Sequence, residues 1–335
     1  MADTDPWKTR CDDEEADDLF FAEEGATFVQ LLCNYFATSV QQERKLKKKE
    51  AQDDMKKAGM LLVSGQEWRD KLQETLIEAY IDKDKVPCVS YSEIFKKVER
   101  VGKATCLVWR KTNSKNRKGK TKKDVGGTGT GFLMSPKSKY GWLVITNNHV
   151  ILDEVEANSA EVFFDHLNDD SRENATSFKV EQLVSKDIRT KSAEDLSSLD
   201  FSVLALKSDD TNENYLENHA SSSNFDESER VNAAGNKSFL NLLNLKFLPI
   251  IAFSHPKGLG KRLSIGKYPD KCETYPISHI KHDLPTQPGS SGANLIYPCQ
   301  GKFDDWWAAF LHYRHHRAVA WQAIGPVIRK DFSLL

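Results

Sequence analysis

The sequence lacks four features that would each narrow its class. No apolar run approaches the ~18 residues of a membrane span. The six cysteines are scattered without a Cys-x-x-Cys pair, so we expect reduced thiols rather than disulfides or a zinc site. Lys and Arg (47) nearly balance Asp and Glu (49), so no charge of one sign indicates nucleic acid or membrane. The acidic first residues, 1–5, contain no signal-peptide core, and we therefore expect a cytoplasmic or nuclear protein.

The apolar content is sufficient for more than one domain. Of the 335 residues, 39% are hydrophobic, which is enough for a substantial core. The residue pattern changes near residue 99. We expect a helical N-terminal region over residues 1–98, with an adaptor or regulatory role as one interpretation, and a β-rich domain over residues 99–335.

The N-terminal region contains two apolar stripes at three- and four-residue spacing, from Phe28 to Phe36 and from Trp68 to Tyr80. Ser64–Glu67 has the pattern of a capping box before the second stripe, and 92–100 predicts a further short helix. Two interpretations remain open. The helices form a bundle that packs on itself or on the next domain, or they dock a partner protein or a second copy of the chain.

Beyond residue 99, short apolar runs alternate with turns rich in glycine, proline and asparagine, which is typical of an all-β barrel or sandwich. The expected strands are 104–109, 130–134, 142–146, 161–164, 178–180, 201–206, 247–253, 293–297, 307–312 and 319–324. Residues 208–237 are rich in Asp, Glu, Ser and Asn, and we expect an exposed linker between two β halves.

A basic tract, 110–123, lies between two expected strands. It is either a solvated hairpin loop or a loop for nuclear import or nucleic-acid contact. No aromatic residue interrupts it, so a base-stacking surface is not expected.

Three chemically useful side chains follow each other in chain order, each beside an apolar run: His149, Asp200 and Ser291. A serine hydroxyl is a poor nucleophile unless a base lies within hydrogen-bond reach, and the base needs an anionic partner to fix its tautomer. Each residue alone has an ordinary structural explanation. Their order and their neighbours together indicate a serine hydrolase. Ser290 is the x of the Gly-x-Ser-Gly pattern, which favours Ser291 as the nucleophile.

Seven stretches carry a family resemblance. They are Gly129–Leu133, Ile145–Val150, Leu199–Leu204, Phe253–Gly258, Thr286–Gly292, Trp307–His312 and Trp321–Lys330, the last two resembling the final strands and the start of a closing helix. With these stretches, the chain from about residue 102 resembles the trypsin-like (chymotrypsin-fold) serine peptidases, in the style of their signal-less glutamyl-endopeptidase-like and HtrA-like members. The resemblance implies an all-β double six-stranded barrel, here with an additional N-terminal α-helical region.

The resemblance also implies roles for individual residues. Ser291 would be the nucleophile, His149 the general base and then acid, and Asp200 the orienting carboxylate. The backbone N–H groups of Gly289 and Ser291 would form the oxyanion hole. The implied function is an intracellular serine endopeptidase acting on protein or peptide substrates, without a cofactor. Its activity is expected to fall as pH drops through roughly 6–7, where histidine takes up a proton.

The histidines His279, His282, His315 and His316 suggest metal binding, but no spacing among them favours a closed site, so we expect no metal. In the glutamyl-endopeptidase resemblance, Thr286 and His312 match the residues that line the primary pocket, and Arg314 adds charge nearby. These donors would suit an acidic side chain before the scissile bond.

Two departures from the family pattern bear on activity. Ser290 stands where zymogen-type members carry an aspartate, so no activation by a freed N-terminus is expected. The run 311–316 is bulkier and more basic than the family's glycine-containing strand. The alternative to an active peptidase is therefore a catalytically weak or inactive scaffold. Such a scaffold would bind peptides or partner proteins, with nucleic acid as a further partner.

Overall fold

The computed structural model describes residues 38, 41–43, 45–80, 90–110, 127–134, 139–169, 172–186, 199–220, 245–267, 279–298, 306–314 and 317–320. Contacts divide the chain into two compact units, Met1–Asp54 and Met55–Leu335. The described residues of the first unit are helical. Residues 55–98 group by contacts with the β-rich part of the chain, and the domain boundary after residue 98 stays a prediction.

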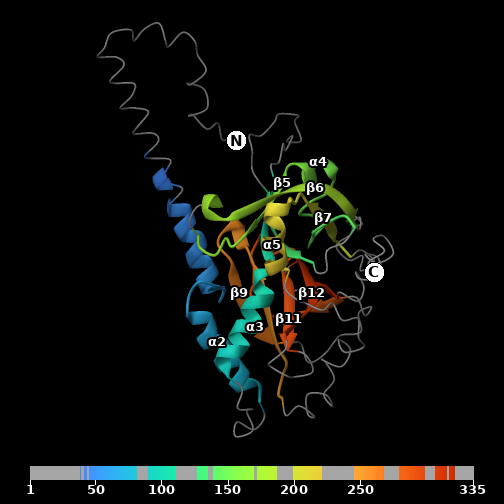
Figure 1. The fold of residues 1–335 in the computed structure, drawn as a ribbon. Coiled ribbons are helices and arrows are strands. Elements are labelled where there is room, and N and C mark those ends of the chain that lie inside the picture. Colours follow the sequence, from blue (N-terminus) through green and yellow to red (C-terminus); the bar gives the residue numbers. More distant parts are fainter. Residues whose placement is uncertain are drawn as a thin grey trace, which may run out of the picture. The chain divides into compact units, whose positions relative to one another are not determined.

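The second unit contains four α-helices among its described elements (Figure 1). They are α2 (Glu67–Ala79), α3 (Tyr91–Lys103), α4 (Glu154–Asn158) and α5 (Asp210–His219), with short 3₁₀ turns at Arg172–Asn174 and Pro256–Gly258. The strands are β1 (Leu61–Leu62), β2 (Thr105–Arg110), β3 (Gly127–Leu133), β4 (Leu143–Thr146), β5 (Ala160–Phe164), β6 (Thr176–Lys186), β7 (Ser202–Leu206), β8 (Pro249–Ser254), β9 (Arg262–Lys267), β10 (His279–Lys281), β11 (Asn294–Pro298), β12 (Trp306–Arg314) and β13 (Arg317–Ala320).

Six of these strands close into an antiparallel barrel in the order β2-β3-β4-β7-β6-β5. β4 and β7 are buried along their whole length, which explains why both read as continuous apolar runs. They pair with Ile145 opposite Val203. Gly131 lets β3 approach its neighbours closely, because a Cβ there would lie 2.6 Å from the Val144 side chain. The predicted first barrel is therefore present.

The second half forms a seven-stranded sheet in the order β1-β9-β8-β11-β12-β13-β10. One of its strands, β1, comes from the N-terminal region and pairs Leu61 with Leu263 of β9. The predicted strand set omitted β1, β9 and β10. β9 escaped prediction because its first residue, Arg262, and its third, Ser264, are polar yet buried.

Helices α2 and α3 pack against this sheet and against the barrel (Figure 1). The stripe predicted from Trp68 onward is the buried face of α2. Trp68 meets Phe95 of α3 edge to face, with ring centroids 5.5 Å apart. Gly102 near the end of α3 lies so close to Phe253 of β8 that a Cβ would come within 2.6 Å of its ring. In this part of the chain the helices pack on the next domain, as the first interpretation held.

The predicted capping box is absent. The N-cap of α2 is Gln66, which makes no side-chain cap hydrogen bond, so Ser64 lies outside the helix. The Ser64 hydroxyl instead donates to Asn168 Oδ1 at 2.7 Å. Ser64 lies inside a turn closed by the hydrogen bond from Gly65 N–H to Leu62 O, two residues before the N-cap Gln66, which accounts for the failed prediction.

The predicted linker, 208–237, begins with a helix rather than an exposed connector. Asp209 caps α5 by accepting from Asn212 N–H, and Leu216 is buried. The polar composition concealed this helix, which buries Leu216 and His219. Residues 221–237, the stripe 28–36 and the basic tract 111–123 lie outside the described residues.

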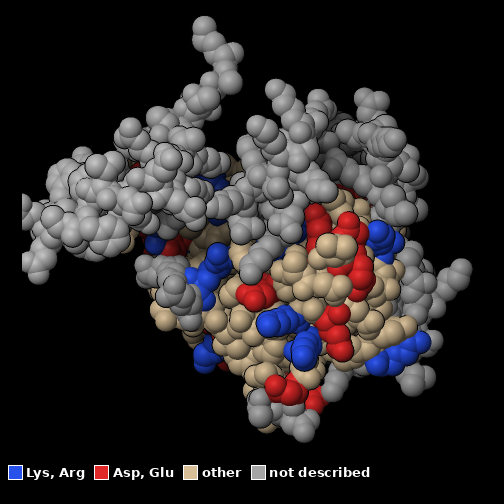
Figure 2. Space-filling model, turned by 90° about the horizontal axis from the view of Figure 1, so that it is seen from above, with Lys and Arg blue, Asp and Glu red and all other residues tan. Residues whose placement is uncertain are grey.

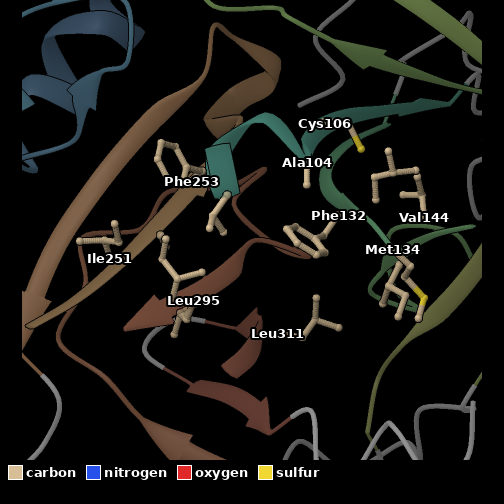
Figure 3. Close-up of a cluster of buried hydrophobic side chains, with 14 of the residues drawn as sticks. Ala104, Cys106, Phe132, Met134, Val144, Ile251, Phe253, Leu295 and Leu311 are labelled. Atoms are coloured by element: carbon tan, nitrogen blue, oxygen red, sulfur yellow. The ribbon is translucent and has the colours of Figure 1, made fainter. Parts of the chain in front are cut away.

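One apolar core runs through the barrel, the second sheet and the two helices. Figure 3 shows Phe132 and Val144 of the barrel in the same cluster as Phe253, Leu295 and Leu311 of the second sheet. The part of the face in Figure 2 that is not grey carries both acidic and basic side chains, and several acidic ones lie side by side in a band. Within the described ranges, no helix has the length and apolarity to cross a membrane.

Candidate active site

His149 and Asp200 form a hydrogen-bonded pair at the ends of two paired barrel strands. His149 follows β4 and Asp200 precedes β7, and Thr146 opposite Ser202 sets this register. His149 Nδ1 lies 2.7 Å from Asp200 Oδ2, and His149 N–H donates to Oδ1 at 3.1 Å. The Asp200 side chain is 4% exposed and the His149 side chain 29%, so a buried anion holds a ring that reaches the surface.

The backbone conformation of Asp200 orients its carboxylate toward the His149 ring. Its φ is +45°, a left-handed conformation that aspartate adopts more readily than most residues. Its carbonyl oxygen accepts from Asn147 Nδ2 at 2.8 Å and from Asn148 N–H at 3.2 Å. The two asparagines that precede His149 therefore fix the residue with which His149 pairs.

The two serines of the loop 286–292 have different environments. Ser290 is 1% exposed, its Oγ donates to Ser254 Oγ at 3.3 Å, and it accepts from Gln287 N–H at 3.3 Å. Ser291 is only partly buried. This difference favours Ser291 as the accessible hydroxyl.

Strand β3 connects the serine loop to the strand that carries the histidine. Thr130 N–H donates to Ser291 O at 2.8 Å. A Cβ on Gly129 would lie 2.5 Å from Val150, the neighbour of His149. Neighbouring β3 residues therefore contact the predicted nucleophile and the residue that follows the predicted base.

Two glycines of the loop have positive φ and no room for a side chain. Gly289 has a φ of +96°, and a Cβ there would lie 2.7 Å from Lys257 N. Gly292 has a φ of +88°, and its Cβ would come within 1.9 Å of Thr130 O. Only glycine fits both positions without moving backbone atoms.

Of the predicted pocket residues, Thr286 begins this loop and His312 lies on β12 beside it. His312 of β12 is 3% exposed and pairs with the loop backbone, because Gly292 N–H donates to His312 O at 2.8 Å. Its Nδ1 lies 3.0 Å from Nε2 of His282, which is also buried. Thr286 is partly exposed, and the Arg314 side chain lies outside what the structure describes.

The sequence suggests no role for His282 beyond metal binding, which its spacing does not favour. Its contact with His312 across the sheet has no sequence signal, since the two are 30 residues apart. In the described part of the chain, no group of three or more His, Cys, Asp or Glu side chains is placed to hold a metal ion.

Buried titratable groups lie beside the 3₁₀ turn that contacts Gly289. Burial lowers the pKa of Lys261 to about 8, and its Nζ donates to Gly102 O at 2.9 Å. Burial and, next, the Lys261 charge hold the pKa of His255 well below its usual range. The His255 ring stacks on His166 at 5.8 Å, so these groups pack the turn against the barrel.

Comparison with known proteins gives one family match. The model of the trypsin-like peptidase domain matches residues 129–303, which is 175 of the 335 residues. This range includes His149, Asp200 and Ser291. No curated protein matches the chain.

Several solved structures resemble the chain at low identity. The HtrA-type protease AlgW with a decapeptide is 14% identical, with 72% of this chain and 67% of that chain covered and a TM-score of 0.43. Deg5 is 15% identical, with 71% and 91% covered and a TM-score of 0.43. A serine endoprotease from Yersinia pestis is 16% identical, with 73% and 68% covered and a TM-score of 0.42.

Proposed function

Because the chain belongs to the trypsin-like peptidase family, we propose that it is a serine endopeptidase with Ser291 as nucleophile, His149 as general base and Asp200 as orienting carboxylate. The observation that carries this proposal is the 2.7 Å contact between His149 Nδ1 and the buried Asp200 Oδ2. It fixes the ring tautomer, so that Nε2 carries the lone pair that a base needs.

The proposed reaction is acyl transfer followed by hydrolysis. Ser291 Oγ attacks the scissile carbonyl carbon while its proton moves to His149 Nε2. His149 then gives this proton to the leaving amine, the peptide C–N bond breaks, and an ester on Ser291 remains. Water, deprotonated by the same nitrogen, cleaves the ester and restores the hydroxyl. Asp200 stabilises the imidazolium in both steps and keeps its own charge.

The N–H groups of Gly289 and Ser291 are proposed to bind the oxyanion of the tetrahedral intermediates. Backbone donors fixed in advance stabilise charge that develops only in the transition state, and each contributes about 10²- to 10³-fold to the rate. The positive φ of Gly289 supports this role, since that conformation turns the loop backbone sharply before Ser291.

For the primary pocket we propose Thr286, His312 and Arg314, with an acidic residue before the scissile bond. The buried contact of His312 with His282 supports this proposal, because a second imidazole can share the positive charge that a bound carboxylate induces. Cleavage of a peptide library tests the specificity. Preference for large apolar or basic residues at that position would refute it.

Covalent labelling tests the enzymatic proposal before any substrate is known. A fluorophosphonate should label the wild-type chain and fail to label Ser291→Ala. Ser290→Ala is the matched control and should still be labelled, because Ser290 Oγ is engaged with Ser254 in the interior. Absence of wild-type labelling would favour the scaffold alternative, and labelling of Ser291→Ala would refute the assigned nucleophile.

The cytoplasm or nucleus remains the proposed location. The cysteine that the described residues include, Cys106, is a free buried thiol, as expected in a reducing compartment. Fractionation of cells that express the tagged chain tests this location. Recovery of the chain only in secreted or membrane fractions would contradict it.

A further inference from the structure

Two carbonyl groups flank Gly289, and each is held by a hydrogen bond from outside the serine loop. Pro288 O accepts from Lys257 N–H at 2.6 Å, and Gly289 O accepts from the Thr130 hydroxyl at 2.8 Å. A trans peptide directs its C=O and N–H to opposite sides. Holding Pro288 O therefore also fixes the direction of Gly289 N–H, and holding Gly289 O fixes the peptide that follows.

The loop is easiest to turn at Gly289. Glycine adopts positive and negative φ with similar ease, so the peptide planes on either side of it have a low intrinsic preference for one orientation. No side chain fits here, because a Cβ would lie 2.7 Å from Lys257 N and 2.8 Å from His255 O. Contacts from neighbouring elements must therefore supply the rigidity that an oxyanion-binding N–H needs.

The Thr130 hydroxyl both donates and accepts a hydrogen bond beside Gly289. Its oxygen accepts from His255 N–H at 2.9 Å while its hydrogen goes to Gly289 O. Thr130 is 0% exposed, so water does not replace either partner. Because Lys257 lies in the same turn as His255, this one hydroxyl joins the turn that holds Pro288 O to the carbonyl of Gly289.

The backbone of Thr130 extends the connection to the proposed nucleophile and base. Thr130 N–H donates to Ser291 O at 2.8 Å, and Thr146 Oγ1 donates to Thr130 O at 2.7 Å. Thr146 ends β4, three residues before His149. The strand that carries the proposed base thereby fixes the position of Thr130. The Thr130 hydroxyl in turn fixes the carbonyl of Gly289.

We propose that Thr130 is a positioning residue whose hydroxyl fixes Gly289 on both sides, directly at its carbonyl oxygen and, through the turn that holds Pro288 O, at its oxyanion-binding N–H. The inference rests on the proposed function, since it assigns a task within the same active site. It does not make Thr130 a catalytic residue, because the hydroxyl contacts the loop and not the reacting atoms.

The test uses Thr130→Val in the full chain, which keeps the shape of the side chain and removes the hydroxyl. The kcat for a peptide substrate and the rate of fluorophosphonate labelling should both fall by about 10- to 100-fold, because only the transition state carries the oxyanion. KM should change by less than about threefold. Thr130→Ser restores the hydroxyl and should recover both rates to within about threefold of wild type.

Thr75→Val separates positioning from a general loss of stability. Thr75 is 6% exposed, and its hydroxyl donates to Lys71 O at 2.8 Å within α2, so the variant also removes a buried hydroxyl hydrogen bond. We expect a lowered melting temperature with kcat unchanged. Equal losses of kcat in Thr75→Val and Thr130→Val, or failure of Thr130→Ser to recover the rate, would overturn the proposal.

A crystal structure of Thr130→Val distinguishes failure of this inference from failure of the proposed function. The inference expects a changed orientation of the peptides on either side of Gly289. Retained orientation overturns it, whatever the activity. A changed orientation in a chain whose wild type is not labelled supports the positioning role and refutes only the enzymatic proposal.

Discussion

Among the residues that the structure describes, two histidine–aspartate pairs lie beside the barrel strands, and His149–Asp200 is the one with the arrangement of a base. His149 offers Nδ1 to Asp200 at 2.7 Å, which leaves Nε2 outside the pair. His219 of α5 uses both ring nitrogens, with Nε2 at 3.0 Å from Asp165 Oδ2 and Nδ1 at 2.8 Å from Tyr215 O. A ring with both nitrogens engaged has no lone pair for a serine proton.

The exposures of the two pairs are opposite. The Asp200 side chain is 4% exposed beneath a ring that is 29% exposed, whereas Asp165 is 41% exposed beside a ring that is 10% exposed. His219 also stacks on the Tyr215 ring, with centroids 4.0 Å apart. A buried carboxylate with an accessible ring suits proton transfer, and an accessible carboxylate with a buried ring suits attachment of a helix.

The largest effect is expected from removing each ring in turn. His149→Ala should lower kcat by about 10⁵- to 10⁶-fold, because on the proposed function Ser291 would lose its base. His219→Ala should leave kcat within about threefold and destabilise the fold by about 1–3 kcal/mol, since α5 loses its contact with Asp165. Peptide hydrolysis and thermal unfolding of both variants give the two readouts. A comparable loss of kcat in His219→Ala would erase the distinction between the pairs.

Only the pair His149–Asp200 was predictable from the sequence, for a physical reason. Both residues adjoin apolar runs that pair inside the barrel, so the pattern that marks the strands also marks the positions beside them. His219 lies in a stretch whose polar composition indicated a linker, and Asp165 follows β5 without a distinctive pattern. Their contact depends on α5 packing across 54 residues of chain, which local sequence does not encode.

In the second sheet, too, the sequence predicted only part of the structure. Strands β8 and β11 were predicted because their central residues are apolar and buried. β1 and β9 were not predicted, because β1 is two residues long and β9 begins with the buried Arg262, which forms an ion pair with Asp169. The hydroxyl of Thr130 escaped prediction as well, since its partners Gly289 and His255 come from distant segments.

The second-largest effect is expected from replacing each of the two carboxylates in turn. Asp200→Asn should lower kcat by about 10⁴-fold, because the amide stabilises the wrong tautomer of His149 and no longer balances its charge. Asparagine suits the comparison, since both aspartates have positive φ (+45° at Asp200, +55° at Asp165) and asparagine tolerates this conformation. Asp165→Asn should leave kcat within about threefold. Measured kcat values that fall equally in both variants would show that Asp165 also supports catalysis.

The smallest effect is a pH dependence of stability at the second pair. The hydrogen bond from His219 and, less strongly, that from Tyr215 lower the pKa of Asp165 to about 2. A folded-state pKa below the unfolded value means that the contribution is complete above about pH 5 and is lost as pH falls toward 2. Because the Asp165 side chain is 41% exposed, solvent screening limits this contribution to about 1 kcal/mol.

Urea unfolding of wild type and Asp165→Asn between pH 6 and pH 2.5 measures this contribution. The free energies of unfolding should differ by about 1 kcal/mol at pH 6, and the difference should shrink as the wild-type carboxylate takes up its proton. The free energy of unfolding of Asp200→Asn, measured over the same pH range, shows whether the stability contribution of the His149–Asp200 pair has the same pH dependence. A difference between wild type and Asp165→Asn that stays constant over this range would mean that His219 holds α5 without drawing on the charge of Asp165.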